Sequence, residues 1–158
     1  MTLQFLPARP SDAVTLTAIA RRSKQHWGYP EEWMKIWAEE LEIRPEFIEK
    51  EMVVKAEAEA EIIGFYALQP HTAYDATDLA HFWLLPEHIG KGYGRQMFEH
   101  MLQTMQKAGA ETLLVESDPY ASGFYEKMGG RKVGERQSSI AGRKLPVYAF
   151  AVGLRNLP

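Results

Sequence analysis

The 158-residue sequence predicts an α+β fold built on a mixed sheet. Two observations carry this prediction. The strand segments of the first half are joined in the manner of antiparallel hairpins. From residue 78 onward, strands alternate with helices, which favours one parallel strand pair in the middle of the sheet.

In the first half, Pro10, Ser11 and Asp12 supply cap and turn residues for a helix. Pro30 and the two glutamates after it begin a second helix, because proline suits the first turn and acidic side chains favour the N-terminus. The predicted elements are a strand at Thr2–Leu6, helices at Ala13–Gln25, 30–41 and Glu46–Glu51, strands at Met52–Ala58 and Glu61–Leu68, and a hairpin turn at Glu59 and Ala60.

The second half has one strongly amphipathic helix, which Gly109 is placed to end. Its apolar face comprises Met97, Phe98, Met101, Leu102 and Met105. The predicted elements are a strand at Asp78–Leu85, the helix at Gly94–Lys107, a strand at Thr112–Glu116, a short helix at Tyr120–Met128, and strands at Val133–Ile140 and Leu145–Val152.

The composition excludes several classes of protein. The 18 basic and 21 acidic residues give a net charge of −3, which argues against a dedicated nucleic-acid binder. The absence of cysteine excludes disulfides, iron–sulfur clusters and cysteine nucleophiles, and the five histidines form no short ligand pair, so we expect no metal. Without a signal peptide or an apolar run of about 20 residues, we expect a cytoplasmic protein with no membrane partner.

The principal chemical signal is a glycine-rich loop between a predicted strand and a predicted helix. Residues 90–95 read GKGYGR. Backbone N–H groups at such a helix start attract anions, and Lys91 and Arg95 add positive charge. The spacing matches neither the Walker loop nor the dinucleotide fingerprint. The loop is therefore either an anion cradle or a tight structural turn.

Two segments resemble the motifs of a known family. Residues 84–94, which read LLPEHIGKGYG, resemble the acetyl-CoA signature of the GNAT superfamily of N-acetyltransferases. Residues 118–129, which read DPYASGFYEKMG, resemble the second motif, Asn-x-x-Ala-x-x-Phe-Tyr-x-x-x-Gly. Three positions depart from the family pattern: Ile89 replaces Arg or Gln, Asp118 replaces Asn, and Gly130 replaces Phe.

The resemblance implies a single GNAT domain over residues 1–158, with a mostly antiparallel sheet of about seven strands flanked by helices on both faces. It also implies acetyl-CoA as the acyl donor. The residues implied to bind acetyl-CoA are Leu84, Leu85, Ile89, Gly90, Lys91, Gly92, Tyr93, Gly94, Arg95, Asp118, Ala121 and Tyr125.

The implied reaction requires one proton to leave the acceptor and another to reach the leaving group. An ammonium with a pKa near the lysine value of about 10.4 must be deprotonated before it attacks a thioester. Asp78, His81 and Glu116 are the candidate bases, and deprotonation through water is the alternative. Tyr125 is implied to protonate the thiolate, against the alternative of a packed tyrosine. A backbone N–H near Leu84 is expected to stabilise the oxyanion.

The aromatic segment before the second helix is the candidate acceptor site. The resemblance places this connection over the acceptor, so we expect His26, Trp27 and Tyr29 to line a pocket where aromatic faces attract an ammonium. The alternative is a hydrophobic clamp of two helices onto the sheet, which we prefer for Trp33 and Trp37 because of their helical spacing.

These features predict transfer of acetyl from acetyl-CoA to a primary amine, with a small molecule such as an amino acid or polyamine as the first choice. Acetylation of a protein N-terminus or lysine is one alternative. A non-catalytic acyl-CoA sensor is another, although a sensor has no need of the Tyr125 phenol. A nucleotide-binding regulator is disfavoured by the glycine spacing. Apolar edge strands near the C-terminus permit a homodimer.

Overall fold

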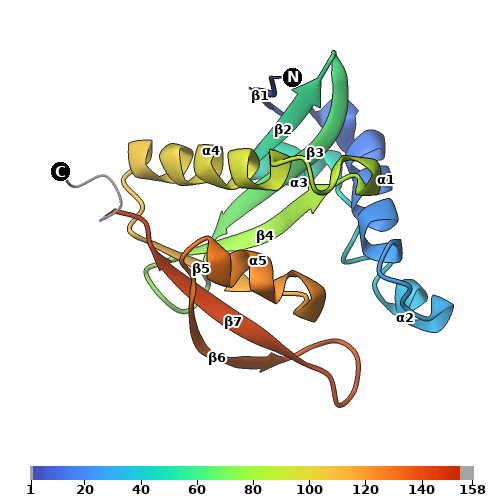
Figure 1. The fold of residues 1–158 in the computed structure, drawn as a ribbon, viewed down its shortest axis with the longest axis vertical. Coiled ribbons are helices and arrows are strands. Elements are labelled where there is room, and N and C mark those ends of the chain that lie inside the picture. The colour runs from blue at the N-terminus through green and yellow to red at the C-terminus, as the bar shows by residue number, and fades with distance from the viewer. Residues whose placement is uncertain (1, 154–158) are drawn as a thin grey trace. The chain divides into compact units, whose positions relative to one another are not determined.

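The structure is a computed structural model that describes residues 2–153. The chain contains two compact units, one of residues 2–68 and 81–97 and the other of residues 69–80 and 98–153. Strand β4 (Thr77–Leu84) and helix α4 (Tyr93–Lys107) each begin in one unit and end in the other (Figure 1). That residues 1–158 form one domain stays a prediction.

Within the described residues, seven strands form a mixed sheet, which confirms the predicted α+β class. Besides β4 they are β1 (Gln4–Pro7), β2 (Met52–Ala58), β3 (Glu61–Pro70), β5 (Thr112–Glu116), β6 (Arg131–Gln137) and β7 (Lys144–Ala151). The strand order is β1-β2-β3-β4-β5-β7-β6. The pairs β1/β2, β2/β3, β5/β7 and β6/β7 are antiparallel. The parallel pair is β4/β5, with Thr77 opposite Leu113 and Asp78 opposite Leu114.

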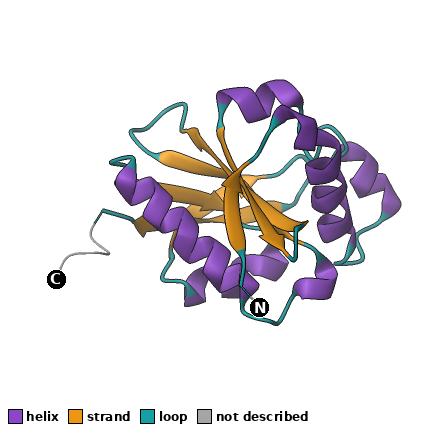
Figure 2. Ribbon diagram, turned by 90° about the horizontal axis from the view of Figure 1, so that it is seen from above, coloured by secondary structure: helices purple, strands orange, loops and turns teal. Residues whose placement is uncertain are grey.

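The helices, drawn in purple in Figure 2, follow the predicted order; α1 has its predicted bounds, and the ends of the other helices are shifted. They are α1 (Ala13–Gln25), α2 (Glu31–Ile36), α3 (Pro45–Lys50), α4 and α5 (Ser122–Lys127), with 3₁₀ turns η1 (Pro10–Asp12), η2 (Pro86–His88) and η3 (Pro119–Ala121). The prediction of one helix through residue 41 was wrong, because α2 ends at Ile36 and separate turns follow. In the described chain no helix is both long and apolar enough to span a bilayer.

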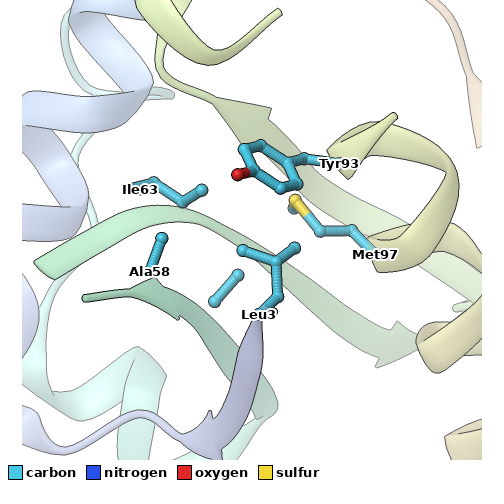
Figure 3. Close-up of a cluster of buried hydrophobic side chains, with 6 residues drawn as sticks. Leu3, Ala58, Ile63, Tyr93 and Met97 are labelled. Carbon is cyan, nitrogen blue, oxygen red and sulfur yellow. The ribbon is translucent and has the colours of Figure 1, made fainter. Parts of the chain in front are cut away.

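The core of the first unit joins α4 to the strands. Tyr93 and Met97 project from α4 toward Leu3, Ala58 and Ile63, and all five side chains are buried (Figure 3). Helix α1 buries a stripe of positions three and four residues apart, formed by Leu16, Ile19, Ala20 and Ser23. Ser23 is therefore a polar residue on the core-facing side of its helix.

The core of the second unit is aromatic. Phe98 of α4 contacts the rings of Phe124, Tyr125 and Phe150, with the Phe150 ring edge-on at 4.9 Å between centroids. A Cβ atom added to Gly130 would lie 2.7 Å from Cζ of Phe150. The Phe150 ring therefore occupies the space beside Gly130, which explains why this chain has no side chain where the family pattern has phenylalanine.

The hairpin between β2 and β3 turns at Glu59 and Ala60, as predicted. Both residues have positive φ, +52° and +67°, which is typical of a two-residue type I′ turn. Neither residue is a glycine, and both nevertheless adopt a left-handed conformation that residues with an L side chain rarely take.

Candidate functional site

The glycine loop leads from the end of β4 to the first turn of α4. Gly90 and Gly92 have φ of +86° and +84°, and a Cβ built on either would meet no atom within 4 Å. These two residues therefore serve the backbone conformation, and the space beside them is open for a ligand. The helix begins at Tyr93, one residue earlier than predicted, and its first turn is closed by Gln96 N–H donating to the Gly92 carbonyl at 3.2 Å.

The side chains around this loop leave several polar groups without partners. Lys91 and Arg95 are exposed and form no ion pair within the described chain. Among the described residues, His88 Nδ1 is the buried side-chain polar atom that has no hydrogen-bond partner. Open glycines, N–H groups at a helix start, two unpaired cations and an orphaned imidazole nitrogen together fit a phosphate-bearing ligand.

Not every loop residue that is implied to bind acetyl-CoA has a side chain available for that contact. The Tyr93 side chain lies in the hydrophobic core, so only its backbone faces the helix start (Figure 3). Ile89 is 45% exposed, and its N–H donates to the Pro86 carbonyl at 3.2 Å. Gly94 lies in the first turn of α4. The polar contact that the family pattern places at position 89 is absent from this chain.

The end of β4 orients one N–H away from β3. A Cβ on Gly64 of β3 would lie 2.6 Å from the Trp83 carbonyl oxygen, so this carbonyl is directed at β3. In a trans peptide the N–H points opposite to the C=O, which directs the Leu84 N–H away from β3. By contrast, the Leu85 N–H donates to the Ile63 carbonyl at 2.8 Å. Of the two leucines implied to bind the donor, Leu84 has the suitably directed N–H.

Tyr125 lies in the second unit and is 6% exposed. Burial, and after it the charge of Asp118, raises the pKa of the Tyr125 phenol well above its usual value. The phenol therefore keeps its proton throughout the physiological range, which suits a hydrogen-bond donor. A second tyrosine lies beside it: Tyr148 Oη donates to the Glu126 carboxylate at 2.6 Å, and the two tyrosine rings are 6.4 Å apart.

The second motif begins with an acidic cap. Asp118 accepts a hydrogen bond from the Tyr120 N–H at 2.9 Å, so its side chain caps the turn η3. Its other carboxylate oxygen lies 3.7 Å from Arg143. Ala121 ends η3, and its N–H donates to the Asp118 carbonyl at 2.8 Å.

The surroundings of His81 disfavour a role as general base. Its ring contacts Phe47 and Phe65, and its Nδ1 accepts a hydrogen bond from the Trp83 indole at 3.0 Å. Burial lowers the pKa of His81 to about 4. A group this weakly basic does not retain a proton taken from an ammonium at neutral pH.

The other two candidate bases are already engaged. Asp78 pairs with His71 Nδ1 at 2.7 Å, and the His71 ring stacks on Tyr74. Glu116 pairs with Arg136 at 2.8 Å. No described group of three or more His, Asp or Glu side chains could hold a metal ion.

The aromatic segment contains two separate groups. His26 and Trp27 contact each other edge-on at 4.9 Å. Tyr29 instead contacts Trp33 and Trp37, and the buried Lys24 ammonium lies 4.2 Å from the Trp37 ring and 5.1 Å from the Tyr29 ring. Tyr29 therefore attracts a cation as expected, but the cation belongs to the protein. These contacts favour the packing alternative for Tyr29.

The structure adds residues that the sequence did not single out. Ser23 donates a hydrogen bond to the Leu84 carbonyl at 3.0 Å, and Arg22 forms an ion pair with Glu87 at 3.0 Å. Gly64 permits the close approach of Trp83. A polar residue on the buried stripe of α1 was the available signal for Ser23. The glycine in the middle of a strand was the signal for Gly64.

The sheet and the glycine loop define an α+β protein whose helix start can hold an anion. The family model described as the acetyltransferase (GNAT) domain matches residues 14–142. The chain therefore belongs to the GNAT acetyltransferase family and is an enzyme of that class. This confirms the resemblance seen in the motifs.

Solved structures of acetyltransferases share this fold. The PaiA N-acetyltransferase from Thermoplasma acidophilum, in complex with coenzyme A, is 20% identical with a TM-score of 0.79, over 96% of this chain and 99% of that one. The ribosomal-protein-S18-alanine N-acetyltransferase from Escherichia coli is 20% identical with a TM-score of 0.71, over 99% of each chain. YncA from Salmonella typhimurium, with its cofactor acetyl-CoA, is 16% identical with a TM-score of 0.70, over 100% and 98%. No curated protein matches the sequence.

Proposed function

We propose that this protein transfers an acetyl group from acetyl-CoA to the primary amine of a small molecule. The observation that carries the proposal is the loop of open, left-handed glycines at the start of α4, flanked by Lys91 and Arg95 and by the orphaned His88 nitrogen. The PaiA N-acetyltransferase structure is a complex with coenzyme A and the YncA structure contains acetyl-CoA, which supports the choice of ligand.

The proposed donor contacts come mainly from the backbone. The N–H groups at residues 92–95, with Lys91 and Arg95, hold the diphosphate, and the Leu84 N–H donates a hydrogen bond to the acyl oxygen and stabilises its partial negative charge. Bound acetyl-CoA would supply a thioester carbonyl that an amine can attack. Lys91 and Arg95 compensate for the missing polar side chain at Ile89.

The proton steps are assigned to water and to Tyr125. Because His81 is a weak base and Asp78 and Glu116 are engaged, we propose that water removes the acceptor's proton. Tyr125 takes its role from its motif position. Its raised pKa supports donation of a hydrogen bond to the thiolate in preference to complete proton transfer.

For the acceptor, the exposed His26 and half-buried Trp27 stay the proposed contacts, and Tyr29 serves packing. A single domain and a cytoplasmic location also stay proposals. A homodimer, which the sequence permits, also stays a proposal.

The test combines calorimetry with thiol release. We expect the protein to bind both coenzyme A and acetyl-CoA, and to release thiol with one or more members of a panel of amino acids and polyamines. Turnover with peptide amines alone would indicate that the acceptor is a protein and not a small molecule. Binding without turnover would indicate a sensor, and absence of binding would overturn the proposal.

A pair of glycine variants sharpens this test. Gly92→Ala should let the free loop relax out of its left-handed conformation, so that coenzyme A binding must restore it at a cost of about 1–2 kcal/mol and is weakened about tenfold. Gly142→Ala is the matched control, because Gly142 has φ of +77° and equally open surroundings in the turn between β6 and β7. Equal affinities for the two variants would contradict the assignment of the loop.

A further inference from the structure

The last turn of α1 makes two contacts with the chain segment that leads into the glycine loop. Ser23 Oγ donates to the Leu84 carbonyl at 3.0 Å. Arg22, the preceding residue, contacts both carboxylate oxygens of Glu87, at 3.0 and 3.2 Å. Consecutive residues of one helix thus hold both ends of the segment from Leu84 to Glu87.

The two contacts differ in weight. Ser23 is 6% exposed, so its hydrogen bond is sheltered from competing water. The Arg22 and Glu87 side chains are 54% and 51% exposed, and exposed ion pairs of this kind contribute little to stability because water screens them. Of the two contacts from α1, the Ser23 hydrogen bond is therefore the one expected to hold the end of β4.

Ser23 acts on the same edge of β4 as the Leu84 N–H. Within a strand, the N–H and C=O of one residue point to the same side. The Trp83 carbonyl and the Leu85 N–H are both directed at β3, so the N–H and C=O of Leu84 both face away from it. Ser23 binds the carbonyl of the residue whose N–H is aimed at the proposed acyl oxygen.

We infer that Ser23 is a positioning residue: its hydroxyl fixes the Leu84 backbone so that the N–H of Leu84 itself meets the acyl oxygen of the donor. This inference rests on the proposed function. A group of this kind acts on the acyl part of the ligand alone, since free coenzyme A has no acyl oxygen. The effect of losing it is therefore specific to the acylated coenzyme.

The experiment compares Ser23→Ala, Ser23→Thr and Thr17→Val with the wild-type chain. Thr17 is the matched control, because it is buried on the same helix and its hydroxyl accepts a hydrogen bond from the Ile43 N–H at 2.8 Å. We expect Ser23→Ala to weaken acetyl-CoA binding and to lower kcat about tenfold, with the coenzyme A Kd within about twofold of wild type. Ser23→Thr, which keeps a hydroxyl, should recover most of the loss.

Thr17→Val should lower the unfolding midpoint and leave both the kcat and the ratio of the two dissociation constants unchanged. The inference is overturned if Ser23→Ala leaves that ratio at the wild-type value, or if Thr17→Val changes it equally. If the wild type binds acetyl-CoA but acetylates no amine, the proposed function fails, and the ratio of dissociation constants still decides the role of Ser23.

Discussion

At the scale of single residues, the phenol of Tyr125 gives the most direct test of the chemistry. Tyr125→Phe removes the hydroxyl and keeps a ring of similar shape among Phe98 and Phe124. If the hydroxyl assists departure of the thiolate, kcat should fall about 100-fold, with the acetyl-CoA KM little changed. Steady-state kinetics with the best amine of the panel measures both constants.

Tyr148→Phe is the matched control for that variant. Tyr148 is a buried tyrosine of the same unit, and its hydroxyl donates to Glu126 at 2.6 Å. The control should lose stability and keep kcat. Equal losses of kcat in the two variants would leave Tyr125 with a packing role, because removing either hydroxyl would then lower kcat by disturbing the folded structure of the unit.

The candidate site was predictable wherever its residues are contiguous. The glycine loop occupies one short segment, so residues 90–95 were recognisable from the sequence of that segment alone. Ser23 and Leu84 are 61 positions apart, and only the folded chain brings the hydroxyl to the carbonyl. The weak basicity of His81 was equally hidden, because Phe47 and Phe65 come from other elements.

At the scale of elements, the hairpin between β2 and β3 contains a strained turn, and a substitution can relieve that strain. Ala60→Gly should raise the free energy of unfolding by about 1 kcal/mol, because glycine adopts φ of +67° without the steric cost that alanine carries. Urea denaturation measures the difference.

Ala58→Gly is the control for this substitution, since Ala58 is buried within β2 and glycine there should destabilise the protein. If Ala60→Gly has no effect or also destabilises the protein, the positive φ at this position carries no strain.

Element boundaries were predictable where side-chain periodicity defines them. Strands β2 and β5 and helix α1 have the predicted bounds. Strand β6 ends at Gln137, three residues before the predicted end. The Gln137 amide donates to the carbonyls of Ser138, Ile140 and Arg143, which closes a turn that a strand pattern cannot show.

At the scale of the whole molecule, the α+β class followed from the order of the elements, and the family followed from two motifs. Both motifs lie in the second half of the chain, whereas the family model matches residues 14–142. The chain's division into two units was not predictable, because β4 and α4 are continuous in sequence and each is divided between the units.

The stability of the folded chain should fall in mild acid because of His81. Its pKa is lowered by burial from 6.5 to about 4 in the folded protein. Below pH 6.5, His81 binds a proton in the unfolded chain but stays neutral in the folded chain. The free energy of unfolding therefore falls as the pH decreases toward 4. The loss attributable to this one residue is up to about 3 kcal/mol.

His81→Gln isolates this contribution, because every other titrating group is common to the two proteins. Urea denaturation of both between pH 7 and pH 4 should show a steeper loss for the wild type, beginning near the ordinary histidine pKa of about 6.5. Parallel curves would show that His81 takes up its proton in the folded state. In that case its enclosure by Phe47 and Phe65 would not keep it neutral, and His81 would return as a candidate base.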